Sequence, residues 1–264
     1  MSKVSASAVF NKPAILDGDF FAFRASSAVQ KDINWGDGLF TCHAYLNDAI
    51  DQFEVLLNQI KTSIHPNTFV IALSSEHNFR KDVDPEYKGN RKNTRKPTCY
   101  QGLIEYIKKN YPYDEQYGFE ADDLMGIYCA VKGYTIVSAD KDMKTIPGYF
   151  YNFLDDSLYH FDKKEAFTNL MIQVITGDRA DNYSGVPGYG KVKATRFIEG
   201  LYKDNPDINE FEVMNKVGDL YLEKTGDDKN FTRMLTLAKI CSDMPYMHSI
   251  MEEYKLLYTN DKQI

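Results

Sequence analysis

This sequence lacks several features that would assign it to a membrane, secreted or repeat-protein class. Its 264 residues contain no apolar run long enough to span a bilayer. The first residues, MSKVSASAVFNKPAILDGD, have neither the long apolar segment nor the cleavage pattern of a signal peptide, which predicts a cytoplasmic protein. There is no internal repeat and no low-complexity linker. The composition, with 43% hydrophobic and 26% charged residues, is that of an ordinary soluble protein.

Metal-binding patterns of cysteine and histidine are also missing. The four cysteines (Cys42, Cys99, Cys129 and Cys241) form no CxxC pair, which favours reduced thiols and argues against a zinc ribbon. The five histidines show no ligand spacing. Any metal site in this chain would therefore have to use oxygen ligands.

Positive charge is scarce overall but concentrated in one place. The formal net charge of −7 would by itself argue against a nucleic-acid partner. However, the stretch RKDVDPEYKGNRKNTRK, from Arg80 to Lys96, carries seven basic and three acidic residues. Such segregation suits a nuclease, which needs carboxylates to hold metal and cations to hold phosphate.

Strand-like and helix-like patterns alternate along the first part of the chain. Strands are predicted within 13–23 (breaking at Asp17), 67–75, 134–140 and in the pair GYFYNFLDD and SLYHFD; helices are predicted at 42–64, 99–111 and 119–133, the last closed by Gly133. This alternation predicts an α/β fold with a mainly parallel central sheet flanked by helices.

After about residue 165 the pattern changes to helix, glycine loop and helix, with further helices expected at 209–226 and 230–244. We therefore expect an α/β core over residues 1–165, which includes a basic segment at about 80–98. A helical region over residues 166–264 should pack against that core.

Carboxylates recur where predicted strands end or helices begin. They are Asp17 and Asp19; Glu120, Asp122 and Asp123; Asp140 and Asp142; and Asp178 and Asp181. Ligand sites in open α/β sheets gather at the carboxyl ends of strands, so these groups should converge on one crevice. Taken alone, the stretch GFEADDLMG (118–126) has a simpler interpretation as a helix start, where the dipole favours anions.

Carboxylates gathered this closely cannot all stay ionised without compensating charge. Only Lys141 and Arg179 lie within these groups. Oxygen ligands without cysteine or histidine suit Mg²⁺ or Mn²⁺ rather than zinc. Eight of these nine carboxylates, all but Asp19, could hold two such ions, and a pair of ions can activate water and stabilise the leaving oxygen of a phosphodiester.

The glycine loop GVPGYGKVKATRF (185–197) nearly matches a nucleotide-binding P-loop. Val192 stands where Ser or Thr is required and no strand precedes the loop, so we expect no nucleotide cofactor. The pattern fits better a helix-hairpin-helix at about 178–200, in which Gly188, Gly190, Lys191 and Lys193 bind DNA phosphates without reading sequence. A simple turn between helices is the alternative.

Five separated motifs together resemble the 5′-nuclease superfamily, which includes flap endonucleases and the 5′–3′ exonuclease domains of bacterial DNA polymerase I. They are LDGDFFAF, FRKDVDPEYKGNRK, FEADDLMG, SADKDMKTIP and GDRADNYSGVPGYG, in the family's order over about residues 13–200. The closer similarity is to phage exonucleases of the T7 type. The resemblance implies a PIN-like nuclease core followed by the helix-hairpin-helix region.

The resemblance also implies a role for each site residue. A first metal site would use Asp17, Glu120, Asp122, Asp123 and Asp140, and a second would use Asp140, Asp142, Asp178 and Asp181. Lys88 and Arg91 would contact the scissile phosphate, with Arg80 nearby, and Tyr87 could stack on a terminal base. Residues 80–98 would form an arch over the site, and the hairpin loop would hold the duplex with a bound K⁺.

One departure from the family pattern concerns the end of the strand FVIAL. The family usually carries an aspartate there, whereas this chain has Ser74 and Ser75. Either Glu76 substitutes for that aspartate or the first metal takes another water.

These features predict a Mg²⁺-dependent 5′-to-3′ exonuclease that acts on duplex DNA with 5′ ends or flaps, and on RNA in RNA–DNA hybrids, in phage DNA replication or degradation. Asp140, Lys88 and Arg91 would be its central catalytic residues. A phage-encoded enzyme would work in the cytoplasm of the bacterial host. Two alternatives remain, a non-catalytic protein that binds DNA ends or flaps and a PIN-type ribonuclease.

Overall fold

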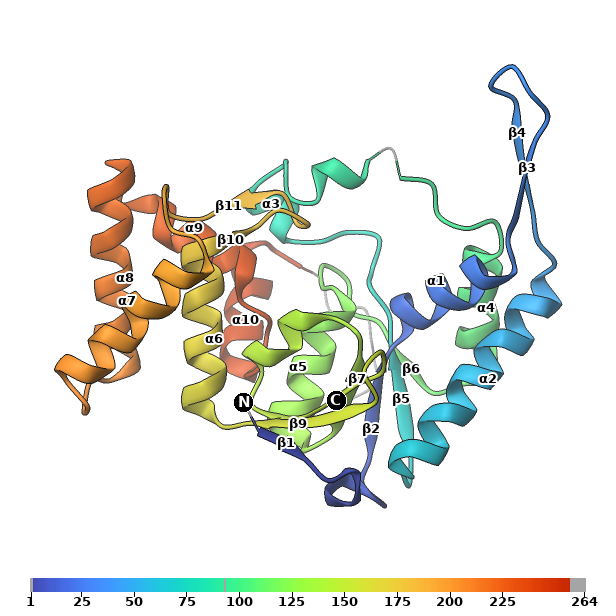
Figure 1. Cartoon of the computed structure of the whole chain (residues 1–264), viewed down its shortest axis with the longest axis horizontal. Helices are drawn as coiled ribbons and strands as arrows, with labels where there is room; N and C mark the ends of the chain where they lie inside the picture. Colours follow the sequence, from blue (N-terminus) through green and yellow to red (C-terminus); the bar gives the residue numbers. More distant parts are fainter. Residues whose placement is uncertain (1, 93, 257–264) are drawn as a thin grey trace.

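A seven-stranded sheet in the order β1-β9-β8-β7-β2-β5-β6 organises the computed structural model, which describes residues 2–92 and 94–256 (Figure 1). The strands are β1 Ser2–Val4, β2 Ala14–Asp17, β5 Phe69–Ala72, β6 Tyr113–Asp114, β7 Thr135–Ser138, β8 Gly148–Asn152 and β9 Ser157–Phe161. The five strands from β8 to β6 run parallel, and β9 and β1 pair antiparallel at one edge. The predicted mainly parallel sheet is confirmed.

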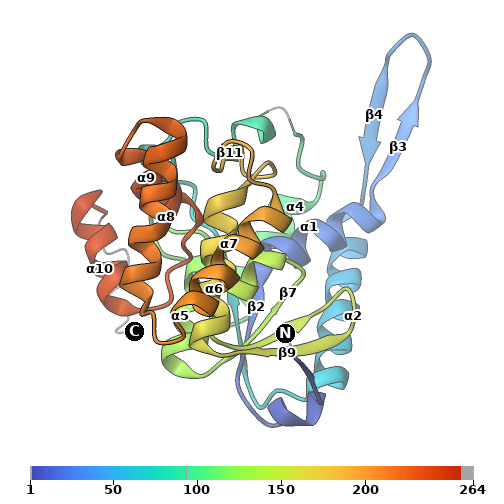
Figure 2. The same ribbon diagram turned by 60° about the vertical axis from the view of Figure 1, so that its left-hand side comes forward.

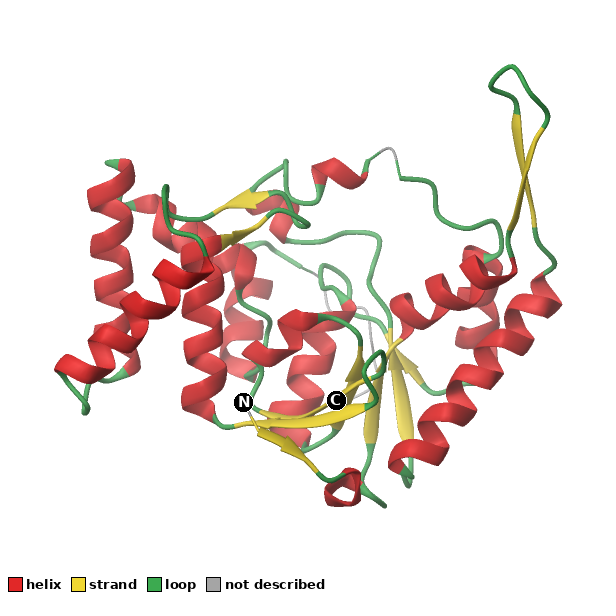
Figure 3. Ribbon diagram, viewed as in Figure 1, coloured by secondary structure: helices red, strands yellow, loops and turns green. Residues whose placement is uncertain are grey.

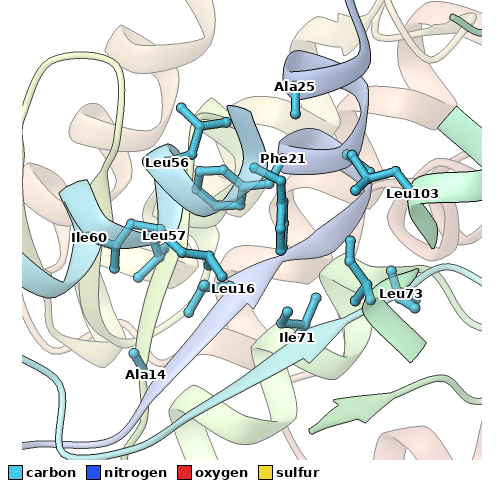
Figure 4. Packing of buried hydrophobic residues seen from close by; sticks show 14 of the residues in the cluster. Ala14, Leu16, Phe21, Ala25, Leu56, Leu57, Ile60, Ile71, Leu73 and Leu103 are labelled. Carbon is cyan, nitrogen blue, oxygen red and sulfur yellow. The ribbon is translucent and has the colours of Figure 1, made fainter. Parts of the chain in front are cut away.

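Helices cover both faces of this sheet. Neighbouring residues of strand β2 point to opposite faces, and each face is covered by different helices. Leu16 packs against α1 (Gly18–Val29), α2 (Leu46–Ile64) and α4 (Tyr100–Asn110), whereas Ile15 faces α5 (Ala121–Lys132) and α10 (Met244–Glu253). Figure 4 shows Leu16 and Phe21 between the helices and the sheet. Both residues are fully buried, so each contributes about 1.5–3 kcal/mol to folding.

A second group of helices lies beside the sheet (Figure 2). It comprises α6 (Lys163–Thr176), α7 (Lys191–Asp204), α8 (Glu210–Thr225) and α9 (Lys229–Ala238), with the short strands β10 (Gly177–Asp178) and β11 (Tyr183–Ser184) between α6 and α7. Leu170, Val174, Ile198, Val217 and Leu237 form its core. After α9 the chain returns to the sheet, where α10 packs against α5. The division into residues 1–165 and 166–264 therefore stays a prediction.

Two segments reach beyond these layers. The hairpin of β3 (Lys31–Asn34) and β4 (Phe40–His43) projects away from the body (Figure 3) and exposes Trp35 and Leu39 at its end. The basic segment, residues 80–98, crosses above the carboxyl ends of the strands from α3 (Arg80–Val83) to α4 (Figure 1). Asn93 of the predicted basic segment lies outside the described residues. Residues 257–264 of the predicted helical region do so as well.

The strand predicted within 13–23 breaks at Asp17 as expected, and the side chain of Asp17 accepts a hydrogen bond from the N–H of Phe20 and so begins helix α1. One predicted helix boundary needs correction. The helix expected over 230–244 ends at Ala238, and a new helix begins at Met244 with Asp243 as its N-cap. Across the part of the chain described, no helix combines the length and apolar character needed to cross a membrane.

Candidate active site

A cleft of about 610 Å³ opens at the carboxyl ends of β2 and β7, beneath the basic segment. Its lining includes six carboxylates and three cationic side chains. They are Asp17, Asp19, Glu120, Asp122, Asp140 and Asp181, with Lys88, Arg91 and Lys96. The sequence predicted this convergence of distant acidic residues, and the excess of negative charge makes the cleft suited to cations.

Asp17 and Asp19 are fixed by hydrogen bonds at the end of β2. Asp17 accepts the hydroxyl of Ser138 at 2.7 Å. Burial, with added repulsion from Asp19 and Asp140, raises the pKa of Asp17 to about 6. Asp19 accepts the hydroxyl of Tyr100 at 2.8 Å and the backbone N–H of Ser74 at 3.0 Å.

The position where the family carries an aspartate is used differently in this chain. The hydroxyl of Ser74 accepts the N–H of Ala121 at 3.0 Å, and that of Ser75 accepts the N–H of Gly118 at 3.0 Å. Both serines therefore hold the loop that leads into α5, and Ser74 also lines the cleft. Glu76 is exposed and is not part of the cleft lining.

Two acidic residues at the start of α5 reach the cleft, and only one of them has cations beside it to balance its charge. Glu120 contacts Lys88 at 2.5 Å and Arg80 at 3.5 Å. Burial opposes its ionisation, but these two cations outweigh burial and lower the pKa of Glu120 to about 2. The pKa of Asp122 is raised well above its usual value, first by burial and then by repulsion from Asp140 and Asp17.

Asp123 does not reach the cleft. It has no exposed surface, and its two oxygens accept hydrogen bonds from Arg80, both at 2.8 Å. Its expected role as a metal ligand does not fit this position, because a buried carboxylate fully paired with a guanidinium has no free lone pair directed at the cleft.

The second predicted group of carboxylates lies on η3 (Lys141–Thr145) and the β10–β11 hairpin. Asp142 is half-buried, and burial together with repulsion from Asp140 raises its pKa to about 7. Asp178 pairs with Lys141 at 2.7 Å; burial raises its pKa, but this ion pair and a backbone N–H bring it below the usual value. Asp178 is held beside the cleft rather than in its lining.

Asp181 connects the hairpin to the basic segment. Its carboxylate accepts Arg91 at 2.7 Å and lies 3.8 Å from Lys88. Lys88 is held in the left-handed region at a φ of 54°, and the N–H of Lys88 donates to the carbonyl of Asp181 at 2.9 Å. The predicted phosphate-contacting pair, Lys88 and Arg91, therefore lies at the cleft against the carboxylates.

Two residues predicted to contact DNA are buried instead. Arg80 has 2% of its surface exposed, with its guanidinium on Asp123 and on the carbonyls of Leu237 and Lys239. Tyr87 has 3% exposed. The hydroxyl oxygen of Tyr87 lies 3.0 Å from Glu120 and 3.1 Å from Asp181, so its one proton is shared between these two acceptors. Neither a phosphate contact by Arg80 nor base stacking by Tyr87 fits these positions.

The sequence analysis missed several cleft residues. Phe23 lines the cleft with 46% of its surface exposed, and Tyr100 and Lys96 line it from α4 and the basic segment. Phe23 lies four residues after Asp19 on the same face of α1, so helical spacing could have placed it near the site. Ser138 could not have been found, because its importance arises only from pairing of strands far apart in sequence.

The chemistry of these donors fits divalent metal ions. The raised pKa values of Asp17, Asp122 and Asp142 show carboxylate charge that burial and mutual repulsion leave poorly compensated, which a cation would relieve. Within residues 2–92 and 94–256, however, no three Asp, Glu, His or Cys side chains form a group that could hold an ion as they stand. Lys88, Arg91 and Lys141 form ion pairs with carboxylate oxygens, and these oxygens would have to turn toward an ion to bind it.

The glycine loop joins two helices, as predicted, but it is longer than expected. Helix α6 ends at Thr176, the β10–β11 hairpin follows, and Gly190 is the N-cap of α7. Gly188 has a φ of 79°, and no heavy atom lies within 4 Å of a Cβ built on Gly188 or Gly190. Lys191 and Lys193 are exposed beside this open backbone. The loop is accessible to a large ligand.

Known proteins with related sequences identify the family of this chain. The family model described as 5′-3′ exonuclease, N-terminal resolvase-like domain, matches residues 12–173. The exodeoxyribonuclease of Enterobacteria phage T3 is 33% identical over 224 residues, which cover 77% of this chain and 70% of that protein. The exonuclease of Escherichia phage T7 is 32% identical over 217 residues, which cover 74% of this chain and 68% of that protein.

The fold is shared with a solved phage structure. The T5 D15 protein co-crystallised with metal ions aligns with a TM-score of 0.62 at 17% identity, covering 92% of this chain and 96% of that one. The chain belongs to the 5′-3′ exonuclease family. Within that family it is an enzyme similar to the exodeoxyribonuclease of phage T3 and the exonuclease of phage T7. The resemblance drawn from its motifs is confirmed.

Proposed function

We propose that this protein is a divalent-metal-dependent 5′-to-3′ exonuclease that hydrolyses duplex DNA from 5′ ends or flaps and removes RNA from RNA–DNA hybrids, in phage DNA replication or degradation. The observation that carries the proposal is the cleft itself, whose lining combines six carboxylates with Lys88 and Arg91. A phosphodiesterase needs both kinds of charge at one phosphate.

Two divalent ions, Mg²⁺ or Mn²⁺, would activate water for attack on phosphorus and stabilise the departing 3′-oxygen. Asp17, Glu120, Asp122 and Asp140 would hold one ion. Asp140, Asp142, Asp178 and Asp181 would hold the other. Asp123 is left out of this set because Arg80 occupies it.

Lys88 and Arg91 would orient the scissile phosphate and stabilise the charge that grows on its oxygens. Both side chains line the cleft and pair with carboxylates there, which supports this role. Phe23 presents an exposed ring at the same cleft and, unlike Tyr87, has a free face for a terminal base.

The glycine loop would bind the duplex away from the cut. The backbone around Gly188 and Gly190 is open, and Lys191 and Lys193 are exposed beside it, so phosphates could be bound without base recognition. A K⁺ ion held by loop carbonyls would support this contact. A related fold, the T5 D15 flap endonuclease, was solved with DNA and metal ions, which favours a DNA substrate here too.

The test is cleavage of 5′-labelled duplex, flap and RNA–DNA substrates in Mg²⁺ or in EDTA. We expect labelled short products in Mg²⁺ only. Asp140→Asn should lower the cleavage rate by about 10²-fold or more, while DNA binding in Ca²⁺ changes little. Asp219→Asn, an exposed residue of α8, is the matched control.

Two outcomes would contradict the proposal. Duplex binding without cleavage in either Mg²⁺ or Mn²⁺ would identify a non-catalytic protein for DNA ends. Faster cleavage of single-stranded RNA than of duplex DNA would indicate a PIN-type ribonuclease.

A further inference from the structure

A buried ion pair joins the start of the basic segment to the start of α5. Arg80 has 2% of its surface exposed and Asp123 has none. The guanidinium donates from Nη1 to Oδ2 and from Nη2 to Oδ1 of Asp123, both at 2.8 Å, which is the bidentate arrangement that fixes both partners in orientation. Neither residue lines the active-site cleft.

The same pair also binds the end of α9 and the segment between α9 and α10, residues 239–243. Arg80 Nε donates to the carbonyl of Leu237 at 3.1 Å, and Nη2 donates to the carbonyl of Lys239 at 2.8 Å. The N–H of Cys241 donates to Asp123 Oδ1 at 3.0 Å. Three parts of the chain far apart in sequence therefore meet at this one pair.

The first turns of α5 consequently have two different faces. Glu120 and Asp122 line the cleft. Asp123 and Gly126, three residues apart and so on one side of the helix, face the α9–α10 segment. A Cβ on Gly126 would lie 2.1 Å from the carbonyl oxygen of Cys241, so only glycine allows this approach.

Asp123 also controls the backbone that carries a cleft residue. Its Oδ2 accepts the N–H of Glu120 at 3.1 Å. Arg80, on the other side, begins the segment that carries Lys88 to its contact with Glu120. Any movement of the pair would thus change the spacing between the carboxylates of α5 and the cation that faces them.

We propose that Arg80 and Asp123 are positioning residues of the nuclease reaction, which set Glu120 and Asp122 against Lys88, and that Asp123 is not a metal ligand. The proposal rests on the proposed function. Removing one partner would leave the other as a buried, unpaired charge, and the structure would have to shift to hydrate it. Small misplacements of reacting groups lower kcat far more than they lower substrate affinity.

A double-mutant cycle of Arg80→Met and Asp123→Asn tests this pair. The readouts are kcat and KM on 5′-labelled duplex, the melting temperature, and binding of Mn²⁺ alone by calorimetry. In the wild-type background, Asp123→Asn should lower kcat by about 10²-fold and leave KM within about threefold. In the Arg80→Met background, the same change should alter kcat and Mn²⁺ affinity by less than about threefold, because the partner is already gone.

Two results would overturn the proposal. If Asp123→Asn weakens Mn²⁺ binding by the same factor in both backgrounds, Asp123 is a ligand. If the variants lower only the melting temperature, with kcat and Mn²⁺ affinity of the folded protein unchanged, the pair has a structural role alone.

Gly126→Ala provides a second test should the charge variants fail to fold. The added methyl displaces the α9–α10 segment without changing any charge, so kcat should fall while KM is retained. Gly218→Ala in α8, where the nearest atom lies at an ordinary 3.5 Å, is the control. An unchanged kcat in folded Gly126→Ala would refute the positioning role. If the wild type itself does not cleave DNA, the proposed function fails instead, and Mn²⁺ binding still reports on the cycle.

Discussion

At the scale of single residues, the carboxylates of the candidate metal sites differ in how their charge is compensated. Glu120, which faces Lys88, has its pKa held at about 2, whereas burial raises the pKa of Asp17 to about 6 and that of Asp142 to about 7. The uncompensated acids therefore oppose folding at neutral pH when no cation is bound. This difference gives a prediction about stability.

Asp142→Asn should stabilise the metal-free protein at high pH and not at low pH. The pKa of Asp142 rises from its ordinary value of 3.8, expected in the unfolded chain, to about 7 in the folded protein. Between pH 3.8 and pH 7 the folded protein therefore keeps this proton, whereas the unfolded chain has lost it. Its stability cost is absent below pH about 4 and complete above about 8. Urea unfolding in EDTA should show the variant more stable than wild type by on the order of 2 kcal/mol at pH 8.

The gap between variant and wild type should close as the pH falls to 4. Asp219→Asn should show no gap at any pH, since the side chain of Asp219 is 73% exposed. A gap for Asp142→Asn that is the same at pH 4 and pH 8 would contradict the raised pKa.

Lys88→Ala should slow cleavage without removing metal. Lys88 is the cation nearest to Glu120 in the cleft, and loss of one group that stabilises transition-state charge costs about 10²-fold in rate. Single-turnover cleavage at saturating Mg²⁺ measures the effect, with Lys216→Ala on the exposed face of α8 as control. An unchanged single-turnover rate would remove Lys88 from the mechanism.

The sequence predicted the set of cleft carboxylates but not the exceptions within it. Asp122 and Asp123 are neighbours on a helix, about 100° apart, so they could not both face one site, and the helical period could have shown this. The burial of Arg80 could not have been predicted, because its carbonyl partners lie 157 and 159 positions further along the chain.

At the scale of elements, the β10–β11 hairpin is the support for Asp178 and Asp181. Its two ends meet at glycines in close contact. A Cβ on Gly177 would lie 2.2 Å from the N of Gly185, and a Cβ on Gly185 would lie 2.1 Å from the carbonyl oxygen of Ile175. Gly177 also has a φ of 68°, which side chains rarely adopt.

Gly185→Ala should therefore destabilise the protein by about 1–3 kcal/mol and reduce cleavage together with stability. Thermal unfolding measures the first effect. Gly190→Ala, where a Cβ meets no atom within 4 Å, should change the melting temperature little. Equal melting temperatures for the two variants would show that the close contact at Gly185 is not required.

Elements with long periodic patterns were predicted well from the sequence, and short ones were not. The helices over 42–64, 99–111 and 119–133 exist with small shifts at their ends, and Gly133 closes the last at a φ of 72°. The β3–β4 hairpin was missed, although Gly36-Asp37-Gly38 between short apolar stretches is a turn signal. Its strands are exposed and carry no core periodicity that would reveal them.

At the scale of the whole molecule, α10 and the segment before it pack into the core formed by the sheet and α5. Cys241, Met247 and Ile250 are buried against α5, and Leu256 packs on Gly118 in the loop before it. Without α10, the apolar face of α5 that it covers would be exposed to solvent. Residues beyond 165 thus contribute packing to the part of the chain before it.

A fragment of residues 1–165 should accordingly fail to fold cooperatively. It would expose the apolar face of α5 and leave Asp123 without Cys241, while the carbonyls that bind Arg80 would be lost. Circular dichroism during heating measures this, with the full chain as control. A sharp unfolding transition in the fragment would show that the division at residue 165 is a true domain boundary.

The projecting hairpin has a practical consequence. Trp35, the only tryptophan in the chain, lies there with 64% of its surface in solvent. Indole emission from the native protein should resemble that of a free peptide, and denaturant should barely shift its colour. Tryptophan fluorescence would then not report unfolding of the core. It would, however, report the binding of any partner to the β3–β4 hairpin.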